Sequence, residues 1–223
     1  MVVLAGGLGT RLGALRKSGP KILQTVAGEP FINHLLRSYQ RLGLTSAHLC
    51  LGYRSAEVVN YLRVSRAAEV EVTWSLDPVP NSGTAAALRA AAPFVAEGFL
   101  LWLGDTYVTP DFVLPDQAAR PLMFLTDRCA DVVPNAALAP DGTVRYCKAG
   151  GPGFSLVDAG LAVMDASFFD DPQVSTLTSL EDCWTALSDQ GRLTGCRITA
   201  EVFDIGTPER IDTLERHLMG LST

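Results

Sequence analysis

The chain has 223 residues, of which 48% are hydrophobic and 19% charged, so it can bury a substantial core and lacks the composition of a disordered segment. Its formal net charge of −6 disfavours a general nucleic-acid binder, which usually carries a basic surplus. It contains no apolar run long enough to span a bilayer and no signal-peptide pattern. We therefore expect a cytoplasmic protein with one domain over residues 1–223 and with neither a membrane nor a nucleic-acid partner.

The first half of the chain alternates between strand-like and helix-like segments. Short apolar or alternating runs predict strands at 1–5, 47–51, 70–75 and 99–103. Apolar residues at helical spacing predict a helix that starts at Pro30 and stops at Gly43, and further helices are expected at 56–62 and 83–92. This alternation is typical of a mainly parallel sheet covered by helices on both faces.

The second half is less regular. Strands are expected at 122–126, 136–139, 144–147 and 161–164, with Asp141-Gly142 as a hairpin turn between two of them. Ser179 has the chemistry of an N-cap for a helix reaching about residue 190, and Thr207-Pro208 predicts the start of a last helix. The apolar residues of that last helix that share a face are Ile211, Leu214, Leu218 and Leu221.

Three short motifs follow predicted strands. A glycine-rich loop comes after the first strand, Gly83-Thr84 after another, and Gly104-Asp105 after a third. In an open α/β sheet, ligands bind beyond the carboxyl ends of the strands. The sequence therefore predicts that these motifs lie at one edge of the sheet.

The glycine loop does not have the spacing of a dinucleotide site. The G-x-G-x-x-G pattern needs a third glycine at the position of Leu12, and Gly13 comes one residue late. Nicotinamide binding is thereby disfavoured, and neither a P-loop nor a nucleophile elbow matches. The five cysteines show no C-x-x-C spacing and the three histidines lie far apart, which argues against a zinc site.

The same loop suits a triphosphate. Backbone N–H groups without side chains can surround phosphate oxygens, and an arginine beside them supplies a planar cationic fork. Lys21 could approach the same anion from the other side, whereas Arg16 and Lys17 could steer the ligand or be merely solvated. A surface turn with solvated cations is the structural alternative. The loop residues assigned to the nucleotide are Gly6, Gly7, Gly9 and Thr10, with Arg11 on the phosphates.

Five segments in order resemble the sugar-1-phosphate nucleotidyltransferases. They are LAGGLGTRLG with PKIL and VAGEPFINHLL, then NSGTAAAL, LWLGDTYV, LVDAGLAVMD and VFDIGTPERI. Within that family, the chain is most similar to the heptose 1-phosphate guanylyltransferases and the N-acetylmuramate 1-phosphate uridylyltransferases. The resemblance implies a Rossmann-like mixed sheet flanked by helices. It also implies transfer of a nucleotide from a nucleoside triphosphate to a sugar 1-phosphate, with GTP and a heptose 1-phosphate as the expected pair.

The resemblance also implies roles for individual residues. Asp105 and Asp204 would hold Mg²⁺, which prefers oxygen ligands, although either alone could be a strand-end turn residue. Arg11 and Lys21 would act with Asp105 in catalysis by neutralising phosphate charge. The positions that resemble the family's base and ribose contacts are Leu4, Gly6, Gly83 and Thr84, and those that resemble its sugar-phosphate contacts are Lys148, Asp158 and Gly160.

Two positions depart from the family pattern. Cys147 stands where the family has a glutamate beside the lysine, which puts one sugar contact in doubt. Ala85-Ala86 replaces a Gly-Gly pair and would narrow the base pocket slightly. The missing glutamate motivates an alternative: a catalytically silent relative that binds a nucleotide-sugar and regulates a partner. A monomer and a homodimer are both compatible with the sequence.

Overall fold

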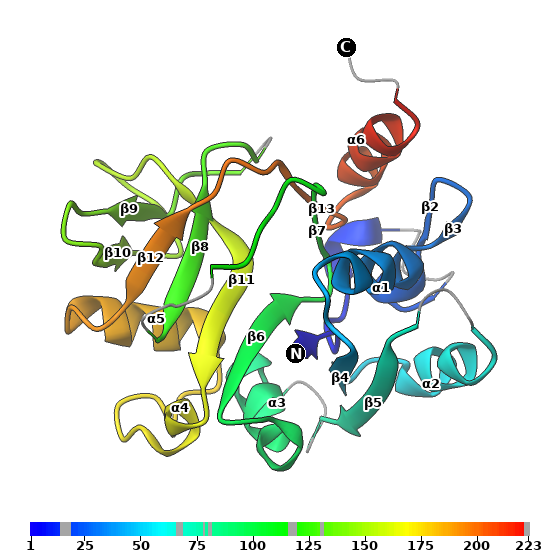
Figure 1. The fold of residues 1–223 in the computed structure, drawn as a ribbon, viewed down its shortest axis with the longest axis horizontal. Helices are drawn as coiled ribbons and strands as arrows, with labels where there is room; N and C mark the ends of the chain where they lie inside the picture. Colours follow the sequence, from blue (N-terminus) through cyan, green and yellow to red (C-terminus); the bar gives the residue numbers. More distant parts are fainter. Residues whose placement is uncertain are drawn as a thin grey trace.

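The computed structural model describes residues 1–13, 19–65, 69–77, 79, 82–115, 120–129 and 132–220. Its centre is a seven-stranded sheet with the order β12-β8-β11-β6-β1-β4-β5 (Figure 1). The strands are β1 (Val2–Leu4), β4 (Ser46–Leu51), β5 (Glu71–Leu76), β6 (Gly98–Leu103), β8 (Leu122–Thr126), β11 (Val157–Asp165) and β12 (Thr194–Arg197). Arg16, Lys17 and Leu221, which figured in the sequence predictions, lie outside these described residues.

The sheet is mixed. Within its described strands, β1 pairs in parallel with β4 and β6, β4 pairs with β5 in the same sense, and β12 runs parallel to β8. Strand β11 is antiparallel to both of its neighbours, β6 and β8. The Rossmann-like mixed sheet expected from the resemblance is confirmed, and so is the mainly parallel pairing expected from the alternation of elements.

Three two-stranded sheets flank the centre. The pair β9 (Ala136–Leu138) and β10 (Val144–Tyr146) is the predicted hairpin, and its turn is fixed by a 3.0 Å bond from the Thr143 amide to the Asp141 carboxylate. The pair β2 (Thr25–Val26) and β3 (Glu29–Pro30) forms a second hairpin. The third pair, β7 (Thr106–Val108) with β13 (Val202–Asp204), sets Asp204 opposite Thr106.

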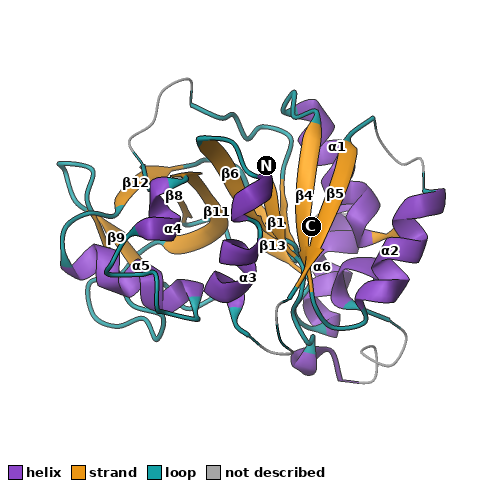
Figure 2. Ribbon diagram, turned by 90° about the horizontal axis from the view of Figure 1, so that it is seen from below, coloured by secondary structure: helices purple, strands orange, loops and turns teal. Residues whose placement is uncertain are grey.

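The helices lie on both sides of the central sheet (Figure 2). One group is α1 (Phe31–Arg41), α2 (Ser55–Val64) and α6 (Pro208–Leu218), and the other is α3 (Thr84–Ala90), α4 (Ser167–Asp170) and α5 (Leu180–Asp189). Two short 3₁₀ helices are η2 (Lys21–Leu23) and η3 (Ala92–Phe94). Both predicted caps are present, since Ser179 Oγ accepts from the Asp182 amide and Thr207 Oγ1 from the Arg210 amide, each at 3.4 Å.

Each face of the sheet has its own hydrophobic core. Along β1, Val3 packs into the core that includes Leu35 of α1, whereas Val2 and Leu4 pack into the core that includes Leu88 of α3. This alternation follows from the two-residue repeat of a strand. Full burial of such side chains contributes about 1.5–3 kcal/mol each, so both layers hold the strand ends rigidly in place.

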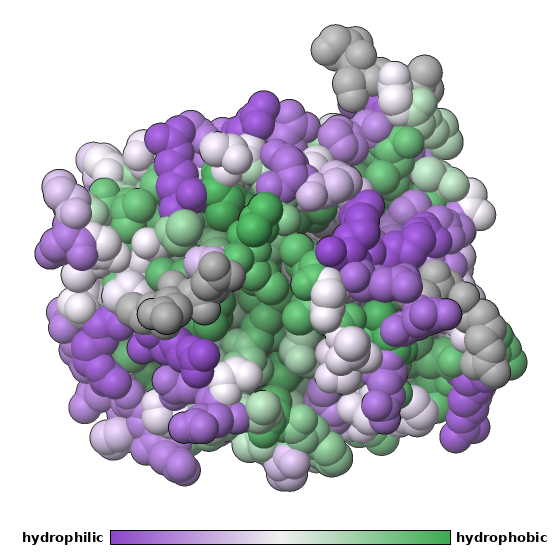
Figure 3. All heavy atoms as spheres, viewed as in Figure 1, coloured by the Kyte–Doolittle hydropathy of each residue, from purple (hydrophilic) through white to green (hydrophobic). Residues whose placement is uncertain are grey.

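The outer surface carries polar residues on both flanks and a band of apolar residues across the centre of the face in Figure 3. Among the described residues, no helix is both long enough and apolar enough to cross a membrane.

Candidate active site

The strand directions bring the predicted motifs to one edge of the sheet. Because β1, β4, β5 and β6 are parallel, the segments that follow them emerge at the same edge. These segments are the glycine loop, Gly52, Asp77 and Gly104-Asp105. The antiparallel strand β11 begins at this edge, which places Asp158 there as well.

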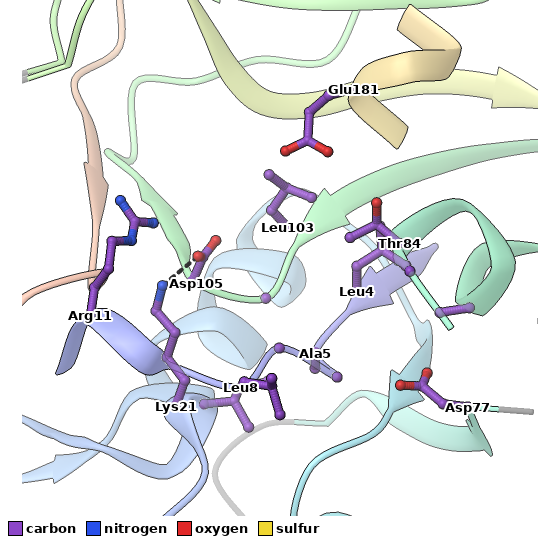
Figure 4. A pocket seen from close by; sticks show the side chains of 16 residues that line it. Leu4, Ala5, Leu8, Arg11, Lys21, Asp77, Thr84, Leu103, Asp105 and Glu181 are labelled. Atoms are coloured by element: carbon purple, nitrogen blue, oxygen red, sulfur yellow. Dashed lines mark hydrogen bonds and ion pairs between the residues drawn. The ribbon is translucent and has the colours of Figure 1, made fainter. Parts of the chain in front are cut away.

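A cavity of about 480 Å³ opens at this edge (Figure 4). Its floor comes from the glycine loop and the ends of β1 and β6, and charged side chains enter it from several elements. The predicted residues that line it are Leu4, Gly6, Gly7, Arg11, Lys21, Gly83, Thr84 and Asp105. Gly9 and Thr10 are not among its lining residues.

A second cavity of about 290 Å³ adjoins the first. The two share Arg11, Thr84, Leu103, Asp105 and Glu181 among their lining residues. The predicted residues Lys148, Asp158, Gly160 and Asp204 all line this second cavity. The structure therefore provides two adjacent compartments, with a guanidinium group and two carboxylates where they meet.

Lys21 and Asp105 form an ion pair at this junction. Lys21 begins η2, Asp105 follows β6, and Lys21 Nζ lies 2.5 Å from Asp105 Oδ2. Burial works to raise the pKa of Asp105, but the charge and hydrogen bond of Lys21 outweigh it and hold that pKa below its ordinary value. Asp105 is therefore an anion at neutral pH, held against a cation that is only 13% exposed.

Arg11 is an exposed cation where the two cavities meet. Its guanidinium lies next to Gly206, where a Cβ would come within 3.3 Å of Arg11 Nη2. It lines both cavities and makes no ion pair within the part of the chain that the structure describes. An exposed guanidinium at the junction of two cavities is suited to binding phosphate oxygens.

Asp204 stands beside Asp105 through backbone pairing. The Ile205 amide donates to the Asp105 carbonyl at 3.0 Å, and Asp204 Oδ1 accepts a 2.7 Å bond from the Gly206 amide. Asp204 also forms an ion pair with Arg210, at the start of α6. Two carboxylates on one cavity fit the oxygen donors that Mg²⁺ takes from a protein when substrate phosphates supply further ligands. The described residues contain no cluster of three or more His, Cys, Asp or Glu that could hold a metal without a substrate.

Asp158 is a half-buried carboxyl group of the second cavity. Its Oδ1 accepts a 2.8 Å bond from the Gly160 amide, and its own amide donates to Asn135 Oδ1 at 2.9 Å. Burial raises the pKa of Asp158 to about 6; the Gly160 bond opposes this, and the charge of Glu181 adds to it. Gly160 has φ +75°, and a Cβ there would lie 2.8 Å from Thr106 Oγ1, so this position requires glycine.

Lys148 forms an ion pair with a carboxylate of helix α5. Glu181 of α5 lies 3.1 Å from Lys148 Nζ and accepts a 2.7 Å bond from Ser179 Oγ. Burial works to raise the pKa of Glu181, but the bonds from Ser179 and Lys148 lower it overall. Lys148 is 68% exposed, so the pair contributes little to stability. Glu181 thus supplies a carboxylate beside Lys148, although Cys147 replaces the glutamate expected in sequence.

Leu4 and Thr84, two of the predicted nucleotide contacts, form hydrogen bonds with other parts of the protein. The Leu4 carbonyl accepts from the Gly104 amide at 2.9 Å, and Thr84 Oγ1 accepts from the Leu180 amide at 2.8 Å. Gly83 has φ +92°, and a Cβ there would lie 2.3 Å from the Thr178 carbonyl oxygen. The Gly83-Thr84 pair therefore also joins α3 to the start of α5. Neither Ala85 nor Ala86 lines the first cavity, which corrects the expectation that they narrow it.

Sequence reasoning missed several residues of these cavities. Asp77 lines the first cavity, Glu181 lines both, and the second also contains Asn135, Tyr146, Trp184 and Arg210. Asp77 carried a usable signal, because a polar residue directly after a predicted parallel strand belongs to the ligand edge. Glu181 lies two residues after the predicted cap Ser179, but no motif marked it as part of a site.

Comparisons with known proteins agree with this geometry. A model of the MobA-like NTP transferase domain matches residues 1–135. N-acetylmuramate alpha-1-phosphate uridylyltransferase of Neisseria meningitidis serogroup B is 25% identical over 94% of both chains. HddC from Yersinia pseudotuberculosis complexed with GMP-PN shares the fold, with TM-score 0.77 and 21% identity over 97% of this chain and 98% of that one. UTP-bound UGPase from Acinetobacter baumannii has TM-score 0.76 and 19% identity over 97% and 92%. The chain therefore belongs to the MobA-like NTP transferase family, and its resemblance to the sugar-1-phosphate nucleotidyltransferases is confirmed.

Proposed function

We propose that the protein makes a nucleotide-sugar and pyrophosphate from GTP and a heptose 1-phosphate, with Mg²⁺ as cofactor. The observation that carries this proposal is the pair of adjoining cavities with Arg11 and the Lys21–Asp105 ion pair at their junction. The first cavity suits the nucleotide, because backbone of the glycine loop lines it. The second suits the sugar, because several polar side chains converge on it.

The reaction needs two phosphate groups to meet in line. A phosphate oxygen of the sugar attacks the α-phosphorus of the triphosphate, a new phosphorus–oxygen bond forms, and the bond to pyrophosphate breaks. Arg11 would bind phosphate oxygens of both substrates, and its position in the lining of both cavities supports this role. Lys21, held by Asp105, brings a second cation to the same point. Catalysis would then come from positioning and charge neutralisation, without a covalent enzyme intermediate.

Asp105 and Asp204 are the residues that would hold Mg²⁺. When bound, the ion would neutralise charge on the triphosphate and the departing pyrophosphate. Both carboxylates are engaged with cations, Lys21 and Arg210 respectively. These contacts keep the two side chains in fixed directions and offset the repulsion between them.

Two observations motivate the choice of GTP and a heptose. HddC of Yersinia pseudotuberculosis, which shares the fold, was solved with GMP-PN. In the second cavity, Asp158 and Glu181 offer acceptors to sugar hydroxyls. A heptose is a polyol whose hydroxyls suit these acceptors. The carboxylate of N-acetylmuramate would have to compete for Lys148 or Arg210, which already pair with Glu181 and Asp204. We therefore favour the heptose over the substrate in the name of the Neisseria relative.

Pyrophosphate release with Mg²⁺ tests the proposal. The assay combines each nucleoside triphosphate with heptose, mannose, glucose and N-acetylmuramate 1-phosphates, and we expect release with GTP and the heptose. Release with another pair would keep the reaction and change the substrates. If no pair releases pyrophosphate but the protein still binds a nucleotide-sugar, the protein is instead a catalytically silent regulator. The presence of all four predicted catalytic and metal residues argues against that alternative; they are Arg11, Lys21, Asp105 and Asp204. Cytoplasmic location and a monomeric or homodimeric state stay predictions.

A further inference from the structure

Arg89 of α3 holds two backbone carbonyl groups that precede α5. Its Nη2 donates to the Leu177 carbonyl at 2.6 Å, and its Nη1 donates to the Val174 carbonyl at 3.4 Å. Both carbonyls belong to the segment of turns between α4 and α5. Helices α3 and α5 lie on the same side of the central sheet (Figure 2). Arg89 and its two partners are not among the described residues that line the two cavities, so this arginine acts on the site from outside it.

The starts of α3 and α5 are joined by two further hydrogen bonds. The Ala85 amide, in the first turn of α3, donates to the Thr178 carbonyl at 2.9 Å. The Leu180 amide, the first of α5, donates to Thr84 Oγ1 at 2.8 Å. The first amides of a helix have no partner within that helix, so each helix start here supplies an acceptor to the other. Together with the bonds of Arg89, these contacts tie the residues that lead into α5 to α3.

This connection determines where Glu181 lies. Glu181 is the second residue of α5 and lines both cavities. Figure 4 shows its carboxylate directed into the first cavity. Ala85 and Leu88 anchor α3 in the core, where both are fully buried, whereas most residues at 171–178 are exposed or half-buried. Loss of the Arg89 bonds should therefore loosen this segment and the start of α5, and leave α3 in place.

We propose that Arg89 is a positioning residue for the sugar phosphate, and that it acts through Glu181. The proposal rests on the proposed function in that it takes Glu181 as an acceptor for a sugar hydroxyl. A hydrogen bond weakens steeply when its distance or angle departs from the favourable range, so a small displacement of the carboxylate lowers the affinity for the sugar. A guanidinium suits this task, because its planar fork binds two carbonyl oxygens at once and its charge strengthens both bonds.

Steady-state kinetics of Arg89→Met measure this role. Methionine keeps the apolar stem of the side chain and removes its donors. We expect KM for heptose 1-phosphate to rise about 3- to 10-fold, as for one weakened hydrogen bond, while kcat and KM for GTP stay within about 2-fold. Arg89→Lys keeps a cationic donor without the fork and should recover part of the lost affinity. Arg63→Met makes the same chemical change on the exposed surface of α2 and should leave all three constants unchanged.

A double-mutant cycle separates positioning of Glu181 from a general effect on the fold. Glu181→Ala removes the acceptor, so Arg89→Met should change KM for the sugar phosphate by less than about 2-fold when Glu181→Ala is already present. Hydrogen exchange of the free protein should also be faster at 177–182 in Arg89→Met than in Arg63→Met. Additive effects in the cycle, an unchanged KM in Arg89→Met or equal exchange at 177–182 would each overturn the proposal. Arg89→Lys takes the place of Arg89→Met in every comparison if the methionine variant does not fold.

Failure of this inference and failure of the proposed function give different results. Pyrophosphate release with additive effects of Arg89→Met and Glu181→Ala would remove the role of Arg89 and keep the transferase. If no sugar phosphate leads to pyrophosphate release, the transferase is removed, and the same cycle is measured on the dissociation constant of GDP-mannose by calorimetry. Non-additive weakening of that binding would keep the role of Arg89, whereas absence of binding would overturn both.

Discussion

Replacement of Asp158 by asparagine should make the protein more stable at neutral pH. The folded protein raises the pKa of this carboxyl group to about 6, chiefly because it is buried. An unfolded chain restores the ordinary value of about 3.9. Since the folded state holds the proton more tightly, ionisation of Asp158 destabilises the fold as pH rises from about 4 to 6, and this cost is constant at higher pH.

The magnitude follows from the two pKa values. A pKa of about 6 in the folded state and about 3.9 in the unfolded state means that ionisation of Asp158 lowers the free energy of unfolding by about 3 kcal/mol at pH 8, at about 1.36 kcal/mol per pKa unit. The same relation gives about 1.5 kcal/mol at pH 5, where the native group is mostly protonated. Asparagine keeps the oxygen that accepts from the Gly160 amide and carries no charge. Asp158→Asn should therefore gain about 1–3 kcal/mol at pH 8 and about half as much at pH 5.

Urea unfolding of both proteins at pH 5, 6, 7 and 8 measures this difference. Linear extrapolation gives the free energy of unfolding at each pH, and the slope against urea shows whether the unfolded states match. Asp165→Asn, at the C-terminal end of β11, is the control for removal of one negative charge, because asparagine keeps the oxygen that accepts from the Ser167 amide. If the gain of Asp158→Asn is the same at all four pH values, or does not exceed that of the control, the buried charge is not its cause.

Three further substitutions separate catalytic from structural roles. Asp105→Asn should lower kcat at least about 100-fold while the near-ultraviolet circular dichroism is retained, because one charge is lost without change of shape; retained turnover would contradict a role in holding the metal. Arg11→Gln should lower kcat by about 100-fold and leave the urea midpoint unchanged, because this guanidinium is exposed and makes no ion pair within the described chain. A fall in the urea midpoint would show a structural role instead. Glu181→Gln should raise KM for the sugar phosphate by about 10-fold and cost less than about 1 kcal/mol of stability; an unchanged KM would remove Glu181 from the sugar site.

The elements with strong local patterns were predictable. The apolar run that ends at Leu103 and the caps at Ser179 and Thr207 indicated a strand and two helices that the structure contains. Local chemistry decides these features, because burial, period and capping act over a few residues. The strands β7 and β13 were missed because each has three residues and exists only through pairing with the other across nearly a hundred positions.

The two halves of the site differ in how far the sequence reveals them. The first cavity could be predicted from the sequence, because residues that follow parallel strands always lie at the same edge of the sheet. The sugar side depends on the reversed direction of β11, which brings the beginning of that strand to the same edge. No residue pattern within 161–164 shows this direction. Glu181 reaches Lys148 only because α5 packs beside β10, a contact between elements far apart in the chain.

Two features that lower stability lie at this edge, since Asp77 leaves a buried oxygen without a described partner and Asp158 carries a raised pKa. Arg11, at the same edge, is an exposed cation with no ion pair in the described chain, whereas in the core the Tyr39 hydroxyl also lacks a described partner. Elsewhere the two cores bury apolar side chains almost completely. Residues that cost stability are retained where a function requires them, so unfavourable residues at the junction of two cavities indicate a functional site. The three groups differ in sign and in the ligand atom they suit: Arg11 suits phosphate oxygens, Asp77 suits a hydrogen-bond donor, and Asp158 suits sugar hydroxyls. One substrate pair, a nucleotide and a sugar phosphate, would satisfy all three at once.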